Sequence, residues 1–203
     1  METINLERAV GVLKNGGVVA IPTDTLFGLA ADVFNTAAVD RIFAIKGRPE
    51  GLALPVLVSG WDQVQRIAEN VPSQASVLTD RFWPGALTLV VRKAPGLPDR
   101  LTAGGQTVAV RMPDHPAPME LIDGLGGPIT GTSANISGSA DLLTLAELTA
   151  ELEGRVDYVV ADGPDPRGTA STVIDITSGQ PKLLREGAIP FEEVRQTWEM
   201  ASN

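Results

Sequence analysis

The sequence of 203 residues contains no cysteine and a single histidine. Without cysteine, the chain cannot form disulfides, bind zinc through sulfur or use a thiolate nucleophile. The one histidine, His115, excludes a metal site built from several imidazoles, and its Asp-His-Pro setting favours a turn or a helix start over a catalytic base. A catalytic triad that depends on histidine is therefore not expected.

Long apolar stretches and excess positive charge are also missing. No apolar run approaches the about 18 residues of a membrane span, and the mean hydropathy is +0.09. The first residues lack the basic and apolar segments of a secretory signal, so we expect a cytoplasmic protein with no membrane partner. A formal charge of -9 argues against an extended nucleic-acid surface, although small anions could bind where positive charge is concentrated in one cleft.

The residues that are present suit an ordinary globular protein, with 43% hydrophobic and 20% charged residues. We expect residues 1–203 to form a single domain, with a core over about 5–190 and a last helix at 190–200. Some neighbouring strands have no helix between them, which predicts mixed rather than purely parallel pairing. The expected fold class is α/β, with a twisted mixed β-sheet flanked by helices.

Hydrophobic periodicity and helix stop signals give the expected elements. A first helix should be capped by Asn5 and end at Gly16-Gly17. Further helices are predicted at 36–45, 61–69, 72–83, 116–122, from 144 onward and at 190–200, and strands at 18–21, 52–58, 87–91, 107–111, 129–132, 156–160, 172–176 and 182–185.

Small polar residues are concentrated between Gly126 and Gly138. After the short strand signal at 129–132 come Ser133, Asn135 and Ser137, with no bulky polar side chain between them. Such side chains can hold a turn by bonding their own backbone, and they can also line a site for an anionic, oxygen-rich ligand. Local sequence leaves both interpretations open.

Two other segments carry candidate site residues. The segment 22–29 follows a buried strand and contains Thr23 and Thr25, and ligands bind beyond strand ends in open α/β sheets, which favours a site over a simple turn. Lys46 and Arg48 flank a glycine at the end of a helix, where two cations would suit phosphate oxygens. The alternative for this pair is that the charges complement the helix dipole.

No P-loop is present, and no Gly-x-Gly-x-x-Gly follows a strand, so a nucleotide would have to bind by another set of residues. Cations combined with small hydroxyl groups, without histidine, fit adenylyl or phosphoryl chemistry. The candidates all lie at predicted strand or helix ends: Thr23, Thr25, Lys46, Arg48, Thr107, Arg111, Ser133, Asn135, Ser171 and Arg185.

Seven segments in this order resemble the YrdC-like threonylcarbamoyl-AMP synthase family over about residues 5–190. They are 22–29, 46–49, 82–89, 107–113, 132–138, 171–173 and 183–187. The resemblance implies a YrdC-like (DHBP-synthase-like) fold with a central cleft. It also implies a reaction of L-threonine, bicarbonate or CO2, and ATP with Mg2+, which yields threonylcarbamoyl-AMP and pyrophosphate for modification of adenosine 37 of tRNA.

The resemblance also implies roles for individual residues. Lys46, Arg48, Ser133 and Asn135 match the catalytic signature at the nucleotide, with Thr107 and Arg185 also on the ATP side. Thr23, Thr25, Arg111 and Ser171 match threonine-binding positions. The implied macromolecular partners are weakly bound tRNA and the downstream tRNA threonylcarbamoyl-transferase proteins. The sequence departs from the family pattern at Phe27, usually tyrosine, at Leu52-Ala53, and at Leu57, often histidine.

Two other functions compete with the synthase. One is a divergent paralogue that acts on another carbamoyl-adenylate or hydrolyses one, against which the intact set of Lys46, Arg48, Ser133 and Asn135 argues. The other is a non-catalytic RNA-binding module, which the net charge of -9 disfavours.

Overall fold

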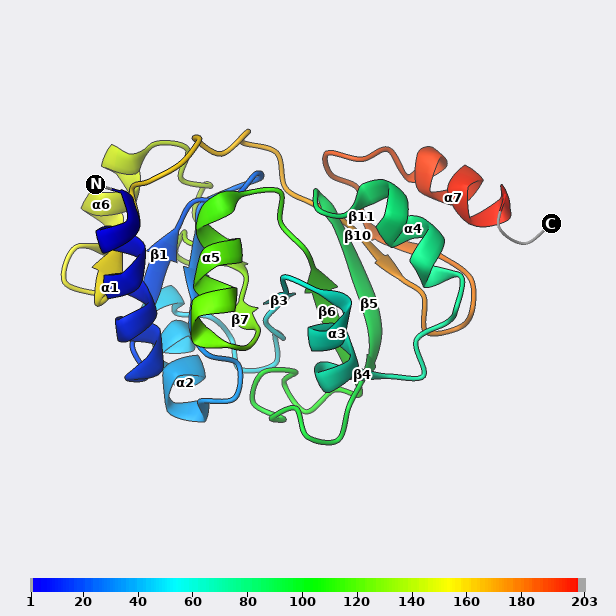
Figure 1. The fold of residues 1–203 in the computed structure, drawn as a ribbon, viewed down its shortest axis with the longest axis horizontal. Helices are drawn as coiled ribbons and strands as arrows, with labels where there is room; N and C mark the ends of the chain where they lie inside the picture. The colour runs from blue at the N-terminus through cyan, green and yellow to red at the C-terminus, as the bar shows by residue number, and fades with distance from the viewer. Residues whose placement is uncertain (1, 201–203) are drawn as a thin grey trace.

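The computed structural model describes residues 2–200, with side chains from residue 6 onward, and contains two mixed β-sheets flanked by helices (Figure 1). The smaller sheet has four strands in the order β8-β2-β1-β9. These strands are β1 (Val19–Ile21), β2 (Gly28–Ala30), β8 (Thr132–Ser133) and β9 (Tyr158–Val159).

The larger sheet has seven strands, in the order β11-β10-β5-β6-β3-β7 with β4 beside β5. They are β3 (Val56–Leu57), β4 (Ala68–Glu69), β5 (Leu87–Lys93), β6 (Thr107–Arg111), β7 (Ile129–Thr130), β10 (Thr172–Asp175) and β11 (Lys182–Arg185). β5 pairs with β10 in parallel and with β6 in antiparallel fashion, which confirms the predicted mixed pairing.

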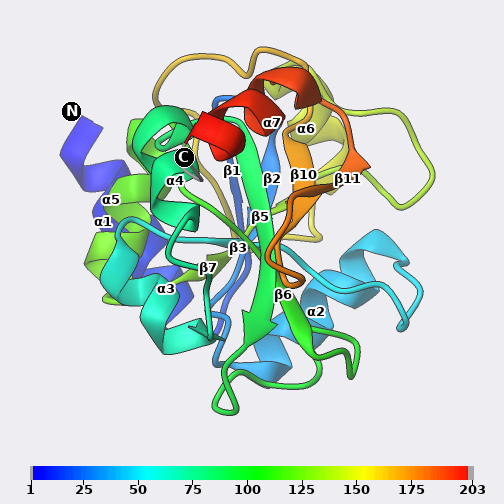
Figure 2. The ribbon, with the colours of Figure 1, turned by 90° about the vertical axis from the view of Figure 1, so that its right-hand side faces the viewer.

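The helices divide between the two sheets (Figures 1 and 2). Beside the four-stranded sheet are α1 (Glu2–Lys14), α2 (Thr36–Lys46), α5 (Pro116–Leu125) and α6 (Leu145–Leu152). Beside the seven-stranded sheet are α3 (Trp61–Ile67), α4 (Ala75–Phe82) and α7 (Phe191–Met200). α1 packs against α5, and α4 against α7. No helix within 2–200 is long and apolar enough to cross a membrane.

The first strand shows why its sequence is a continuous apolar run. Val19 and Ile21 join the apolar cluster beneath α1 and α5, whereas Ala20 joins the larger cluster on the opposite face. A strand buried on both faces has no solvent side on which polar residues could alternate. The run at 18–21 is therefore explained by its position between two layers of core.

The predicted strand at 129–132 is divided at Gly131. β7 pairs with β3 in the larger sheet, and β8 pairs with β2 in the smaller one. A Cβ atom at Gly131 would lie 2.5 Å from Cγ of Leu57, so only glycine lets the backbone pass this side chain. The chain thus crosses from the larger to the smaller sheet at Gly131, and the structure has two sheets where one was expected.

Several local predictions are wrong. The helix predicted at 61–69 ends at Ile67, and Ala68–Glu69 form the short strand β4. Of the strand predicted at 52–58 only Val56–Leu57 forms, and Leu52 is 48% exposed. Pro55 has no N–H to donate to a ladder, and the carbonyl groups of Leu52 and Ala53 accept hydrogen bonds from Arg48 instead.

The first helix begins at Glu2, so Asn5 lies inside it and is not its cap. The predicted helix start at His115 is confirmed, because Nδ1 of this residue accepts the N–H of Ala117 at 3.1 Å.

Candidate active site

The segment after β1 forms a tight turn organised by one hydroxyl group. Thr23 Oγ1 donates to the carbonyl of Leu26 at 2.7 Å and accepts the N–H groups of Thr25 and Leu26, each at 3.2 Å. The hydroxyl oxygens of Thr23 and Thr25 lie 3.1 Å apart. The two threonines therefore hold the turn and also line a cavity, so the two interpretations of this segment are compatible.

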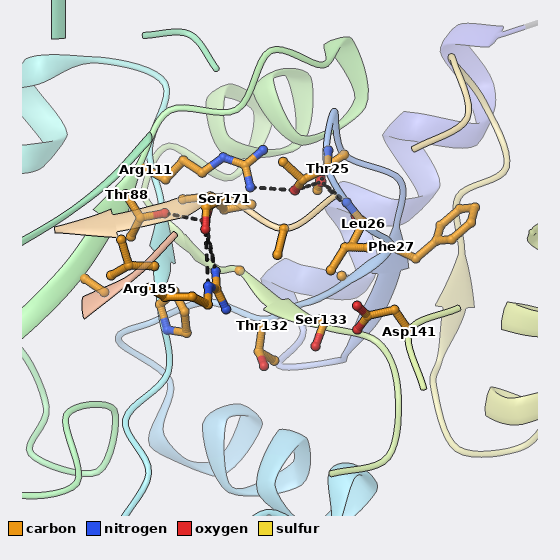
Figure 3. A pocket seen from close by; sticks show the side chains of 18 of the residues that line it. Thr25, Leu26, Phe27, Thr88, Arg111, Thr132, Ser133, Asp141, Ser171 and Arg185 are labelled. Atoms are coloured by element: carbon orange, nitrogen blue, oxygen red, sulfur yellow. Dashed lines mark hydrogen bonds between the residues drawn. The ribbon is translucent and has the colours of Figure 1, made fainter. Parts of the chain in front are cut away.

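Arg111 ends β6 and connects the larger sheet to this turn. Its Nη1 donates to Thr25 Oγ1 at 2.7 Å (Figure 3). Its Nε donates to the carbonyl of Gly85 at 2.9 Å, and its Nη2 forms an ion pair with Asp24. The arginine is only 7% exposed, and burial lowers its pKa while the Asp24 carboxylate opposes that shift. The guanidinium group is therefore fixed in position before any ligand binds.

Asp24 has one satisfied and one unsatisfied carboxylate oxygen. Oδ1 accepts from Arg111 and from the backbone N–H of Asp114, the latter at 3.2 Å. Oδ2 is buried and has no hydrogen-bond partner among the described residues. The carboxylate of Asp24 thus pairs with Arg111. The pair joins the two sheets, because Asp24 follows β1 of the smaller sheet and Arg111 ends β6 of the larger one.

A second hydroxyl cluster lies where β5, β10 and β11 adjoin. Thr88 Oγ1 and Ser171 Oγ are 2.8 Å apart. Nη2 of Arg185 donates to the Ser171 hydroxyl at 3.2 Å and to the Ser171 carbonyl at 2.9 Å (Figure 3). Ser171 thereby joins Thr88 to the cation of Arg185.

The two cations at the end of α2 have different surroundings. Gly47 adopts φ 55°, a left-handed conformation that ends the helix and separates the two side chains. Lys46 is 1% exposed, and its Nζ donates to the carbonyl groups of Ser133 and Asn135, the second at 2.6 Å. Arg48 donates to Leu52 and Ala53 and lines the cavity.

Burial strongly affects the ammonium group of Lys46. Desolvation lowers its pKa from 10.5 to about 8; Arg48 adds to this shift and Asp141 opposes it. The pKa of Arg48 is also lowered by burial. The bonds of Lys46 go to a distant loop, so its position is not explained by the dipole of its own helix.

The Ser-x-Asn segment is held by its own side chains as well as by Lys46. Ser133 Oγ donates to Asn135 Oδ1 at 2.6 Å, and Asn135 Nδ2 donates to the carbonyl of Ser139 at 2.6 Å. Ser133 faces the cavity, whereas Asn135 is buried behind it. As at Thr23, these hydrogen bonds hold the turn, and the hydroxyl-bearing Ser133 also lines the cavity.

These residues surround one cavity of about 240 Å³ between the two sheets. Its lining includes the guanidinium-bearing residues Arg48, Arg111 and Arg185 and one acidic residue, Asp141. The formal charge of the whole chain is -9, so the cavity lining is positively charged although the chain as a whole is negatively charged. The cavity is suited to an anionic ligand.

Most of the predicted site residues converge on this cavity. Those that line it are Thr23, Thr25, Arg48, Arg111, Ser133, Ser171 and Arg185. Lys46 and Asn135 are behind Ser133, in contact with it but outside the lining. Thr107 is not part of the lining; it pairs with Arg92 at the end of β6 opposite to Arg111.

Polar residues of the site that are absent from the predicted set include Asp24, Thr88, Thr132 and Asp141. Asp24 and Thr88 are within segments that carried the resemblance, and Thr88 is a polar residue in an apolar strand, which was a usable signal. Asp141 sits in a polar loop, where an acidic residue gives no such signal.

A cationic cavity lined by hydroxyl groups, between two sheets of an α/β fold, is typical of an enzyme that binds a small anionic substrate. The sequence model of the Sua5_yciO_yrdC family, whose description reads "Telomere recombination", matches residues 11–187. The chain therefore belongs to the Sua5/YciO/YrdC family.

Two curated relatives illustrate the extent of the match. The threonylcarbamoyl-AMP synthase of Pyrococcus abyssi is 38% identical over 97% of this chain and 58% of its own length. The threonylcarbamoyl-AMP synthase of Vibrio vulnificus is 34% identical over 90% of this chain and 98% of its own length. The chain thus spans little more than half of the first relative and nearly all of the second.

The fold agrees with a solved structure of the family. The crystal structure of P. abyssi Sua5 complexed with L-threonine superposes with a TM-score of 0.91 at 39% identity, over 95% of this chain and 56% of that one. The agreement confirms the predicted fold and places the sheets described above within a known architecture.

Proposed function

We propose that this protein is a threonylcarbamoyl-AMP synthase, which converts L-threonine, bicarbonate or CO2, and ATP into threonylcarbamoyl-AMP and pyrophosphate. The observation that carries the proposal is the convergence of Arg48, Arg111 and Arg185 with six hydroxyl-bearing residues on one cavity, from segments up to 162 residues apart (Thr23 to Arg185). The near-complete coverage of the V. vulnificus synthase supports the same activity.

L-Threonine would occupy the part of the cavity near Arg111. Three of the five guanidinium N–H groups bond to Asp24, Thr25 and Gly85, which leaves two with no acceptor among the described residues. A carboxylate is the anion that two such groups recognise best. The hydroxyl groups of Thr23 and Ser171 are available for the polar atoms of the amino acid, and the related P. abyssi Sua5 has been solved with L-threonine.

ATP would occupy the part near Arg48, Ser133 and Arg185, where two cations and a hydroxyl group can neutralise and orient phosphate oxygens. Among residues 6–200, no three histidine or acidic side chains are grouped closely enough to hold a metal ion. Mg2+ would enter as the ATP complex and neutralise phosphate charge, and Asp141, the acidic residue of the lining, could help to hold it.

In the proposed reaction the neutral amine of threonine first adds to CO2 and loses one proton to water, which gives a carbamate anion. A carbamate oxygen then attacks the α-phosphorus of ATP in line, forming an O–P bond while the bond between the α- and β-phosphates breaks and pyrophosphate leaves. Arg48 and Arg185 would stabilise the negative charge that grows on the leaving group. The reaction requires no covalent intermediate on the enzyme.

The product would serve the threonylcarbamoyl modification of adenosine 37 in tRNA, through weak contact with tRNA and through downstream transferase proteins. The test is pyrophosphate release from ATP and bicarbonate with each amino acid in turn. We expect release that depends on threonine. Release that is indifferent to the amino acid would refute the proposal and favour a paralogue with another substrate.

A further inference from the structure

Lys46 differs from the other cations of the site because it does not face the cavity. Its side chain is 1% exposed and is absent from the lining, whereas Arg48, two residues later, is part of it. The left-handed turn at Gly47 directs the two side chains into different environments. A cation so deeply buried is not placed to contact a ligand in the cavity.

The partners of Lys46 are backbone groups of one segment. Its ammonium group donates to the carbonyl oxygens of Ser133 and Asn135, and its own carbonyl accepts the N–H of Ser137 at 2.8 Å. An ammonium group has three N–H donors, and two of them are used here. Three hydrogen bonds thus attach the end of α2 to the segment 133–137.

This segment carries a hydroxyl group that lines the cavity. Ser133 is held between the pairing of β8 with β2 and the Lys46 bonds, and its side chain donates to Asn135. Without the ammonium group, two carbonyl oxygens in a partly buried setting would lose their donor, which favours rearrangement of the backbone around them.

We propose that Lys46 is a positioning residue, whose ammonium group fixes the segment 133–137 so that Ser133 is presented to the nucleotide, while Arg48 is the cation that contacts phosphate. The part that concerns the nucleotide rests on the function proposed above. The attachment of the segment to α2 is a property of the protein alone, so it can be tested without any ligand.

The first measurement is hydrogen exchange of backbone amides in the ligand-free protein. The informative amides are those of Ala134, Ser137 and Ser139, which donate to Phe27, Lys46 and Ile136. We expect Lys46→Met and Lys46→Arg to exchange these amides at least about tenfold faster, because arginine keeps the charge but its larger planar group does not fit the same two carbonyls. Arg48→Met is the matched control and should leave them unchanged.

The second measurement is calorimetric binding of ATP and of AMP. If Lys46 acts through the segment, both of its variants should weaken ATP and AMP by the same factor, whereas Arg48→Met should weaken ATP more than AMP. The proposal is overturned if Lys46→Met loses ATP selectively, Lys46→Arg restores it and the exchange rates do not change, since that pattern identifies a direct phosphate contact.

Failures of the two proposals can be told apart. If the unmodified protein binds neither nucleotide, the synthase function is refuted, and hydrogen exchange alone decides the role of Lys46. If both Lys46 variants fail to fold while Arg48→Met folds, the positioning role is also overturned, because Lys46 would then support the whole fold and not one segment.

Discussion

The buried ion pair of Asp24 and Arg111 offers the sharpest test of how the site is built. Their side chains are 2% and 8% exposed, and Asp24 is the anion that faces the guanidinium group directly. Asp24→Ala would leave a buried cation with only neutral partners, Thr25 and Gly85. Breaking one side of such a pair costs about 3–5 kcal/mol.

The assay is urea unfolding at pH 7, followed by circular dichroism. With a slope of about 2 kcal/mol per molar urea, a loss of 3–5 kcal/mol moves the midpoint down by about 1.5–2.5 M. Asp114→Ala is the matched control, because its carboxylate pairs with Arg167 at 3.7 Å with both side chains exposed, and such pairs contribute less than about 1 kcal/mol.

The double variant Asp24→Ala with Arg111→Met separates charge from packing. Removing both partners also removes the unpaired charge, so the double variant should be less destabilised than the sum of the two single variants. If Asp24→Ala costs no more than Asp114→Ala, the pair is accessible to water and the account of a preorganised Arg111 is wrong.

Three further outcomes are expected. The pKa of Lys46 falls from 10.5 to about 8 on folding, so between these pH values the unfolded chain binds more protons at this residue. The free energy of unfolding of the unmodified protein, relative to that of Lys46→Met, should therefore rise from pH 8 to 10.5 and be constant below pH 8. A relative free energy of unfolding that falls in this window would contradict the burial of the charge. Gly131→Ala places Cβ 2.5 Å from Leu57 Cγ, which should lower the free energy of unfolding by about 1–3 kcal/mol, and recovery on adding Leu57→Ala would identify this contact as the cause. Thr88→Val removes the hydroxyl bonded to Ser171 and should raise the KM for threonine about threefold to tenfold with little change in kcat. Thr107→Val, outside the cavity, is the control and should leave this KM unchanged. Equal effects of the two variants on KM would refute the placement of the threonine site.

The sequence predicts well those features that depend on local pattern. The strands 107–111 and 182–185 form with the predicted bounds, and the helix predicted from 144 onward does begin there, with a capping box between Thr144 and Glu147. Each rests on residues that are close in the chain: an apolar run bounded by polar residues, or a threonine and a glutamate three residues apart.

Features that depend on partners distant in the chain could not be predicted in this way. Lys46 and Arg48 are alike in type and are separated by one glycine, and only the fold shows that one is buried against residues 133–135 while the other lines the cavity. The same holds for Asp24, which meets Arg111 across 87 residues. The crossing between the sheets at Gly131 passes close to Leu57, a contact that no periodicity reveals.

The central claim is that one cavity joins threonine, CO2 and the adenylate of ATP. The most direct measurement is mass spectrometry of the product formed from ATP, threonine and 13C-bicarbonate. The account predicts an adenylate that carries one threonine and one 13C atom, together with pyrophosphate. Release of ADP and phosphate, or of AMP without incorporated label, would contradict it.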